Sequence, residues 1–198
     1  MNRFSLHQAL ATCVILAITT VHGARADDNT EITAEDFQCL TDMTAVRHFF
    51  IDNLDGDIEA TLSVAQSPEG GTYPEGSVVQ LVPGEAMVKR SPGFNPATSD
   101  WEFFELDVSA EGTAIRKRGF TEVVNRFGGN CFECHAKAAP QWDLLCDNNH
   151  GCDPIPLTRS VIATIQKTDP RCAPVALTDE DKQNLQLLKA FAEANASR

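Results

Sequence analysis

Two cysteines three positions apart, followed at once by a histidine, are the residues of this 198-residue chain best equipped for chemistry. They lie in the C-x-x-C-H pentapeptide Cys131-Phe132-Glu133-Cys134-His135. Two thiols at this spacing can add across the two vinyl groups of one haem, and the adjacent histidine can donate an imidazole nitrogen to the iron. We therefore predict one covalently bound haem c, attached through Cys131 and Cys134, with His135 as an axial iron ligand.

Three alternatives compete with haem attachment. The pentapeptide could arise by chance, it could be a thioredoxin-like redox pair, or it could be half of a zinc site. A redox pair would be expected in a βαβ context, and the chain before Cys131 does not show that pattern. A zinc site would require a second ligand pair at short spacing, whereas the later cysteines are spread out at Cys146, Cys152 and Cys172. The predicted export of the chain also favours haem.

Residues 1–26 have the pattern of a cleavable signal peptide. Arg3 supplies a positive start, residues 9–21 are largely apolar, and residues 24–26 form an A-x-A cleavage site. The apolar run is too short to remain as a membrane-spanning helix. We therefore expect export to the periplasm, no membrane insertion after cleavage, and a single haem-binding domain formed by residues 27–198.

The mature chain is strongly acidic. The net charge of the full chain is −12, and loss of Arg3 and Arg25 in a segment without acids makes it −14. Such a charge argues against nucleic acid and anionic membranes as partners. It is compatible with docking on a basic redox partner protein.

Four cysteines remain in the mature chain besides the pair in the pentapeptide. In an oxidising compartment they are expected to form two disulfides, and the sequence permits three pairings. We favour Cys146 with Cys152, which closes a short loop, and Cys39 with Cys172, which joins the two ends of the domain.

The hydrophobic periodicity changes along the chain and predicts an α+β fold. We expect helices at about 34–46, 120–127, 136–145 (interrupted by a proline), 158–166 and from 178 onward. Strands are expected at about 48–51, 58–65, 77–82, 85–89, 101–108 and 113–117. The interpretation is an antiparallel β meander of about five strands with flanking helices and one haem against the sheet. Asn130 is placed to cap the turn that carries Cys131.

The order of these features resembles the cytochrome P-460 family, which includes the β-sheet form of cytochrome c-prime. The resemblance lies in Tyr73-Pro74-Glu75-Gly76-Ser77-Val78-Val79 upstream and in Cys131, Cys134, His135-Ala136 and Asp143 downstream, and it covers about 73–145. It implies a haem against an antiparallel sheet, a distal pocket of strand side chains, and chemistry on small nitrogen species such as nitric oxide or hydroxylamine. Some members carry a lysine cross-linked to the haem. This chain has Gln80-Leu81 where that lysine is expected and Lys89 on the next strand, so the cross-link stays open.

The sixth iron ligand decides between the possible functions. Met87, on a strand of the predicted sheet, is our first candidate, and a thioether ligand would suit electron transfer. Met43, His48 and His150 are weaker candidates. The remaining alternative is an open iron with an apolar distal wall made of Phe49, Phe50, Phe103 and Phe104.

Several functions are therefore consistent with the sequence. The preferred one is an exported mono-haem c-type cytochrome whose iron binds small diatomic or nitrogenous ligands, transfers electrons, or does both. The alternatives are a P-460-type enzyme that oxidises hydroxylamine or nitric oxide, a closed Met/His-ligated electron carrier, and a haem-free, disulfide-linked binding domain. Trp142 is placed where it could contact a haem edge. Arg116, Lys117 and Arg118 could pair with haem propionates, although a solvated strand end is the simpler interpretation.

Overall fold

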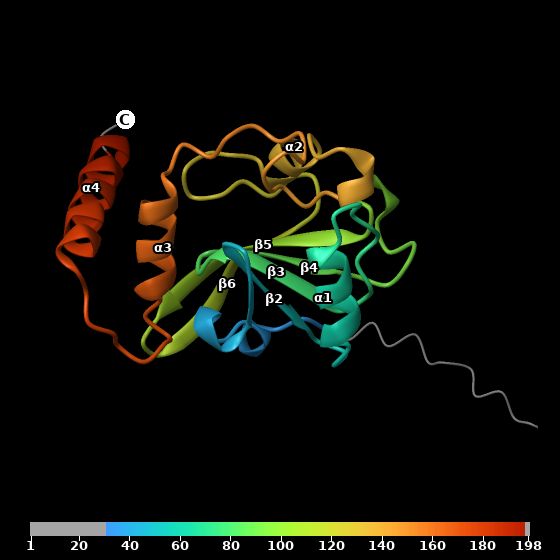
Figure 1. Cartoon of the computed structure of the whole chain (residues 1–198), viewed down its shortest axis with the longest axis horizontal. Helices are drawn as coiled ribbons and strands as arrows, with labels where there is room; N and C mark the ends of the chain where they lie inside the picture. Colours follow the sequence, from blue (N-terminus) through green and yellow to red (C-terminus); the bar gives the residue numbers. More distant parts are fainter. Residues whose placement is uncertain (1–30, 197–198) are drawn as a thin grey trace, which may run out of the picture. The chain divides into compact units, whose positions relative to one another are not determined.

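The computed structural model describes residues 31–196, which fold as an antiparallel sheet with helices around it (Figure 1). Six strands are present in this range, and each is hydrogen-bonded to the next in sequence order. They are β1 (Thr44–Val46), β2 (Phe49–Asn53), β3 (Ser77–Val82), β4 (Glu85–Lys89), β5 (Trp101–Ser109) and β6 (Gly112–Gly119). The α+β class and the meander are confirmed, but the sheet has six strands rather than about five. The predicted signal peptide, residues 1–26, lies outside the described residues.

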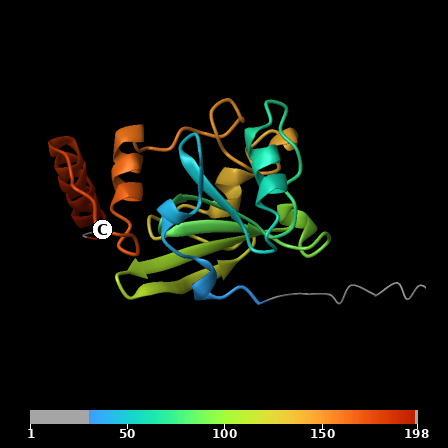
Figure 2. The ribbon, with the colours of Figure 1, turned by 60° about the horizontal axis from the view of Figure 1, so that its bottom comes forward.

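Four α-helices surround the sheet in the described range. They are α1 (Ile58–Gln66), α2 (Cys131–His135), α3 (Arg159–Lys167) and α4 (Asp179–Ala196). Single 3-10 turns occur at η1 (Ala34–Asp36), η2 (Leu40–Asp42), η3 (Pro96–Thr98) and η4 (Pro140–Trp142). In two views of the molecule α3 lies between α4 and the sheet (Figures 1 and 2). Within residues 31–196 no helix combines the length and the apolar character that a membrane span requires.

The two faces of the sheet bury separate sets of side chains, because successive residues of a strand point to opposite faces. One face, here called the α2 face, packs against α1 and against the segment that carries α2. Its buried strand residues are Val46, Phe49, Ile51, Val79, Met87, Trp101 and Phe103. The opposite face is covered by the N-terminal segment, through Ile32 and Phe37. Its buried strand residues are Val78, Ala86, Val88, Phe104 and Leu106.

Residues 58–65 form helix α1 and not the predicted strand. The apolar residues alternate, but Ile58, Leu62 and Ala65 also recur at helical spacing and pack on the α2 face. Asp57 then decides the structure, because its carboxylate caps the helix by accepting the amide of Ala60 (3.2 Å). A short apolar run is compatible with both the strand period and the helix period. Here the cap at Asp57 and packing on the sheet favour the helix.

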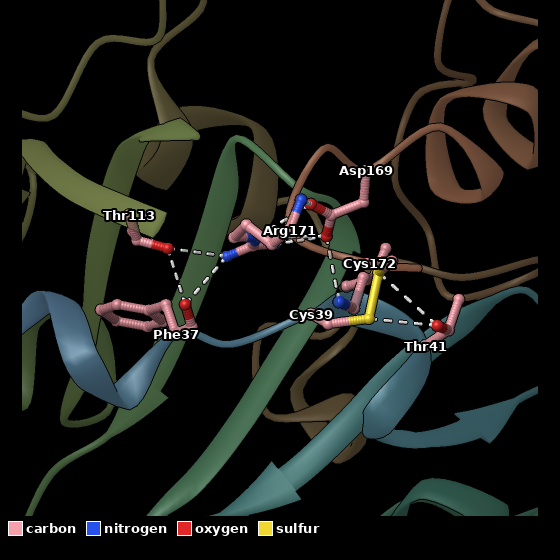
Figure 3. The surroundings of a disulfide bond; sticks show 8 residues. Phe37, Cys39, Thr41, Thr113, Asp169, Arg171 and Cys172 are labelled. Atoms are coloured by element: carbon pink, nitrogen blue, oxygen red, sulfur yellow. Dashed lines mark hydrogen bonds and ion pairs between the residues drawn. A yellow bond between two sulfur atoms is a disulfide. The ribbon is translucent and has the colours of Figure 1, made fainter. Parts of the chain in front are cut away.

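The predicted helix at 34–46 is also wrong. This segment forms η1, η2 and strand β1 at the edge of the sheet. Its backbone groups have partners far along the chain: the carbonyl of Phe37 accepts from Thr113 and Arg171, and the amide of Leu40 donates to Asp169 (Figure 3). These long-range bonds replace the local ones that a helix requires.

The segment after β6 contains no helix at 120–127. Asn125 takes over the local hydrogen bonds, because its side-chain oxygen accepts the amides of Phe127 (3.0 Å) and Gly129 (2.9 Å). The predicted helix at 136–145 is reduced to the single turn η4. Both corrections lie in the segment that carries the C-x-x-C-H motif.

The C-terminal helices agree better with the sequence. Thr158 caps α3 through the amide of Val161 (3.2 Å), and Thr178 with Asp181 forms the predicted capping box of α4. However, α4 is held to α3 mainly through polar groups, since Asp181 and Asn184 bond to Thr164. Leu185 and Leu188 are half-buried, whereas Phe191, which was expected to point inward, is exposed.

Two disulfides are present, with the pairing that we favoured: Cys39–Cys172 and Cys146–Cys152. The first joins residues 133 positions apart and lies beside the buried ion pair of Asp169 and Arg171 (Figure 3). The second closes a loop between residues 6 positions apart. Cys39–Cys172 therefore links the N-terminal segment to the chain after α3. Cys146–Cys152 closes the loop that follows α2.

The two disulfides should contribute unequally to stability. Loop-closure entropy gives about 5 kcal/mol for the long loop of Cys39–Cys172 and about 2 kcal/mol for the short loop of Cys146–Cys152. Urea unfolding of the paired alanine variants C39A/C172A and C146A/C152A should therefore show the larger loss for the first. Equal losses would mean that the long-range link does not restrict the unfolded chain as proposed.

Candidate functional site

Helix α2 presents the C-x-x-C-H motif on a short segment that is fixed at its start. The side chain of Asn130 accepts the amide of Glu133 (2.9 Å), so Asn130 is the N-cap, as predicted. Just before it, Val124 and Asn130 form an isolated antiparallel bridge, and the amide of Cys131 donates to the carbonyl of Val123 (3.0 Å). Val123 is itself buried on the α2 face of the sheet, which anchors the start of α2 to the core.

The two motif cysteines are free thiols within one helical turn, while the other four cysteines of residues 31–196 form disulfides. Cys131 is half-buried against the core and Cys134 is exposed. Burial, with a further contribution from Glu85 and Glu105, raises the pKa of the Cys131 thiol to about 12. A redox-active pair works through a thiol whose pKa is lowered. The environment of Cys131 has the opposite effect and does not favour a thioredoxin-like function.

His135 is oriented by a hydrogen bond from its own ring. The Nδ1 atom lies 2.8 Å from the carbonyl oxygen of Leu144. A carbonyl can only accept, so Nδ1 carries the proton, and Nε2 is left as the nitrogen with a lone pair. Burial lowers the pKa of His135, which favours the neutral imidazole that binds a metal. The ring packs against Phe103 on the α2 face, with 5.4 Å between ring centroids.

Two glutamates on neighbouring strands hold the loop before α2 against the sheet. Glu85 of β4 and Glu105 of β5 are cross-strand partners, and both lie on the α2 face. Glu85 accepts from the side chain of Asn125 (3.0 Å), and Glu105 accepts from the amide (3.0 Å) and Nε (2.9 Å) of Arg126. Arg116 adds a further ion pair to Glu105 (2.9 Å). The loop at 123–130 is therefore fastened at two adjacent positions.

The carboxyl groups of Glu85 and Glu105 differ in their hydrogen-bond partners and in their electrostatic surroundings. Glu105 is fully buried; its Oε1 receives the arginine donors, whereas its Oε2 has no hydrogen-bond partner. Burial, together with the charge of Glu105, raises the pKa of Glu85. The pair thus places a carboxyl group bound by two arginines and a carboxyl group with a raised pKa beside the segment that carries Cys131.

Lys89 is not available for other bonds in this structure. Its side chain is 6% exposed, and its Nζ contacts both carboxylate oxygens of Asp143 (2.7 and 2.9 Å) and the carbonyl of Ser99 (2.7 Å). The ammonium also lies 5.1 Å from the centre of the Trp101 ring. Although Lys89 and the amide of Tyr73 act against it, burial raises the pKa of Asp143. The structure therefore places Lys89 on the α2 face as an ion-pair partner.

The candidate sixth ligands are separated by the sheet. Met87 is buried on the α2 face and is the cross-strand partner of Phe103, whose ring contacts His135. Met43 packs on the opposite face. The structure thus brings Met87 into the neighbourhood of His135, while the sheet lies between Met43 and the α2 face.

The two other candidate histidines have partners away from the motif. The Nε2 atom of His48 lies 3.3 Å from Asp147. His150 is buried, donates from Nδ1 to the carbonyl of Leu145 (2.7 Å), and stacks on Trp142 at 3.8 Å between ring centroids. Trp142, predicted as a possible contact of a haem edge, has His150 stacked on its ring in this structure.

The predicted wall of four phenylalanines does not form. Phe49 and Phe103 lie on the α2 face and Phe104 on the other, and strand alternation directs Phe50 away from Phe49. Two residues of the basic cluster pair with carboxylates inside the protein. Arg116 and Arg118 pair with the buried carboxylates of Glu105 and Glu102. They compensate buried charge in the sheet.

The donor set fits a covalent haem better than a zinc ion. Among residues 31–196, no three His, Cys, Asp or Glu side chains come together in an arrangement that could hold a metal ion, so Cys131 and Cys134 have no further zinc ligands there. Haem attachment requires only two thiols and a histidine nitrogen with a lone pair, and the motif supplies all three: Cys131 and Cys134 are free, and His135 has its Nδ1 proton on the carbonyl of Leu144.

Comparison of the chain with protein-family models, with curated proteins and with solved structures gives no match.

Replacement of Glu85 and of Glu105 by glutamine should have opposite effects on the free energy of unfolding at neutral pH. Because the pKa of Glu85 is raised in the folded state, the free energy of unfolding should fall as pH rises from the ordinary value of 4.5 through the folded value. Glu85→Gln keeps an oxygen for Asn125 and should remove this fall. Glu105→Gln, in contrast, removes the charged partner of Arg116 and Arg126 and should cost about 2 kcal/mol, since both arginines are partly exposed.

Urea unfolding of both variants between pH 4 and pH 8 provides the measurement. A loss of stability in Glu85→Gln as large as that in Glu105→Gln at pH 7 would contradict the assignment of a raised pKa to Glu85.

Proposed function

We propose that this protein is an exported mono-haem c-type cytochrome, with haem c attached to Cys131 and Cys134 and its iron bound by His135. The observation that carries the proposal is the hydrogen bond from Nδ1 of His135 to the carbonyl of Leu144. It fixes the tautomer and directs the other ring nitrogen away from the protein partner, which is the preparation that metal-binding histidines share. Two unpaired thiols in the same helix, in a chain whose other described cysteines are oxidised, support it further.

When bound, haem would supply an iron that takes small ligands or exchanges an electron. The chain contributes the proximal nitrogen of His135, an apolar surface around Phe103 and Phe132, and the carboxyl groups of Glu85 and Glu105 nearby. The cytochrome P-460-like architecture, with a haem against an antiparallel sheet, is part of the proposal.

The position of Met87 favours an open iron over a closed Met/His carrier. Phe103 lies against the ring of His135, and Met87 lies beside Phe103 on the same face of the sheet. Met87 is 3% exposed and packed within the core of this face, so its thioether would have to leave the core in order to bind an iron held by His135. We propose that the iron binds small neutral ligands such as nitric oxide or carbon monoxide.

A second function, the P-460-type oxidation of a small nitrogen compound, has one observation in its favour. Such a reaction needs a group that moves protons near the iron, and Glu85 has a raised pKa beside Cys131. A lysine cross-link through Lys89 would first require its ion pair with Asp143 to break. We therefore keep the enzyme as the alternative and the ligand-binding cytochrome as the proposal.

The proposed setting is the periplasm, because haem attachment of this type is made outside the bacterial cytoplasm. A net charge of −14 after removal of residues 1–26 suits a basic redox partner protein and does not suit nucleic acid.

Optical spectroscopy of the exported protein tests the proposal. The ferric form should be high-spin, and the ferrous form should shift when carbon monoxide is added. His135→Ala should retain the covalent haem but lose the spectrum of the histidine-ligated iron, whereas the control His48→Ala should keep the wild-type spectrum. A low-spin wild-type spectrum that does not respond to carbon monoxide would contradict an open iron.

A further inference from the structure

We propose that the buried ion pair of Lys89 and Asp143 positions the proximal histidine and thereby sets the reduction potential of the haem iron. The inference rests on the proposed function, since it concerns the ligand His135. It assigns Lys89 a positioning role, through a chain of contacts that runs from strand β4 to the histidine ring.

The first contact holds Asp143 to the sheet. Lys89 ends β4 and points to the α2 face, and its three N–H donors meet the two oxygens of Asp143 and the carbonyl of Ser99. Asp143 also accepts the amide of Tyr73 (2.8 Å), and its backbone carbonyl accepts Nε1 of Trp101 (2.7 Å). One residue is thus fixed from three separate strands or loops through both its side chain and its backbone.

The second step is the unusual backbone at this point. Asp143 and Leu144 both have left-handed conformations, with φ of 48° and 65°. Such conformations are unfavourable for residues other than glycine and persist only where the surroundings hold them. The contacts of Asp143 with Lys89, Tyr73 and Trp101 are the ones that hold this turn.

The third step joins the turn to the ligand. The carbonyl of Leu144, one residue after Asp143, accepts the proton of Nδ1 of His135 at 2.8 Å. A firm hydrogen bond at this nitrogen increases the electron donation of the imidazole to the metal and favours the ferric iron. Loss of the Lys89–Asp143 pair should release the turn, weaken this hydrogen bond and raise the reduction potential.

The strand offers a matched control. Arg90 follows Lys89, lies on the opposite face of the sheet and forms a similarly buried ion pair with Glu102 (3.2 Å). Arg90→Met should therefore lower the free energy of unfolding, as Lys89→Met should, but leave the position of His135 unchanged. A purely structural role of Lys89 would make the two variants alike in every measurement.

The experiment compares the haem-loaded wild type with Lys89→Met, Asp143→Asn and Arg90→Met by potentiometric titration and by resonance Raman spectroscopy of the ferrous iron–histidine stretch. For Lys89→Met we expect a roughly tenfold loss of preference for ferric iron, as is typical of groups behind a metal ligand, which raises the potential by about 59 mV for one electron. The iron–histidine stretch should move to lower frequency.

Asp143→Asn keeps an oxygen for the amide of Tyr73 and provides a milder variant if Lys89→Met does not fold. It should shift the potential and the stretch in the same direction by a smaller amount. Unchanged values in the folded variants, or an equal shift in Arg90→Met, would overturn the inference while the haem stays attached. A wild-type protein without covalent haem would instead overturn the proposed function.

Discussion

The alternation of side chains along β4 and β5 is the constraint on which the candidate site depends. In register, Glu85, Met87 and Lys89 of β4 lie opposite Glu105, Phe103 and Trp101 of β5, and all six share the α2 face. Each end of this surface holds a different part of the motif segment. The glutamates hold the loop before α2, Phe103 contacts the ring of His135, and Lys89 with Trp101 holds the turn after α2. A one-residue slip of either strand would turn the three groups of that strand away from α2.

Buried charge is handled by pairing throughout the sheet. Three carboxylates that are nearly or fully buried, on Glu102, Glu105 and Asp143, each meet an arginine or a lysine. A buried ion pair contributes little net stability, but removal of one partner is costly because the other charge remains buried. Such pairs therefore fix geometry, and two of the three lie beside the segment that carries the motif. In this acidic chain, these three buried acids pair with the basic residues Lys89, Arg90, Arg116, Arg118 and Arg126.

The sequence indicated the reactive residues better than their surroundings. The spacing of Cys131, Cys134 and His135, the cap by Asn130 and the strands from 77 onward were predictable from local patterns, and the disulfide pairing was favoured by loop length and chain ends. Helix α1 was not predicted because its apolar residues fit both the strand period and the helix period. The structure of residues 34–46 was not predicted because their hydrogen-bond partners lie far along the chain. The hydrogen bond between His135 and the carbonyl of Leu144 could not be predicted from the sequence, since every residue type supplies a backbone carbonyl. Glu85 and Glu105 could be recognised as a pair only once the strand register was known.

The central claim is that the thiols of Cys131 and Cys134 carry a haem. Mass spectrometry of the intact exported protein after treatment with an alkylating reagent, without reduction, tests it most directly. The account predicts the mass of the mature chain plus one haem, less four hydrogens for the two disulfides, with no alkylation. A chain that lacks the mass of haem and takes up two alkyl groups, at Cys131 and Cys134, would contradict it.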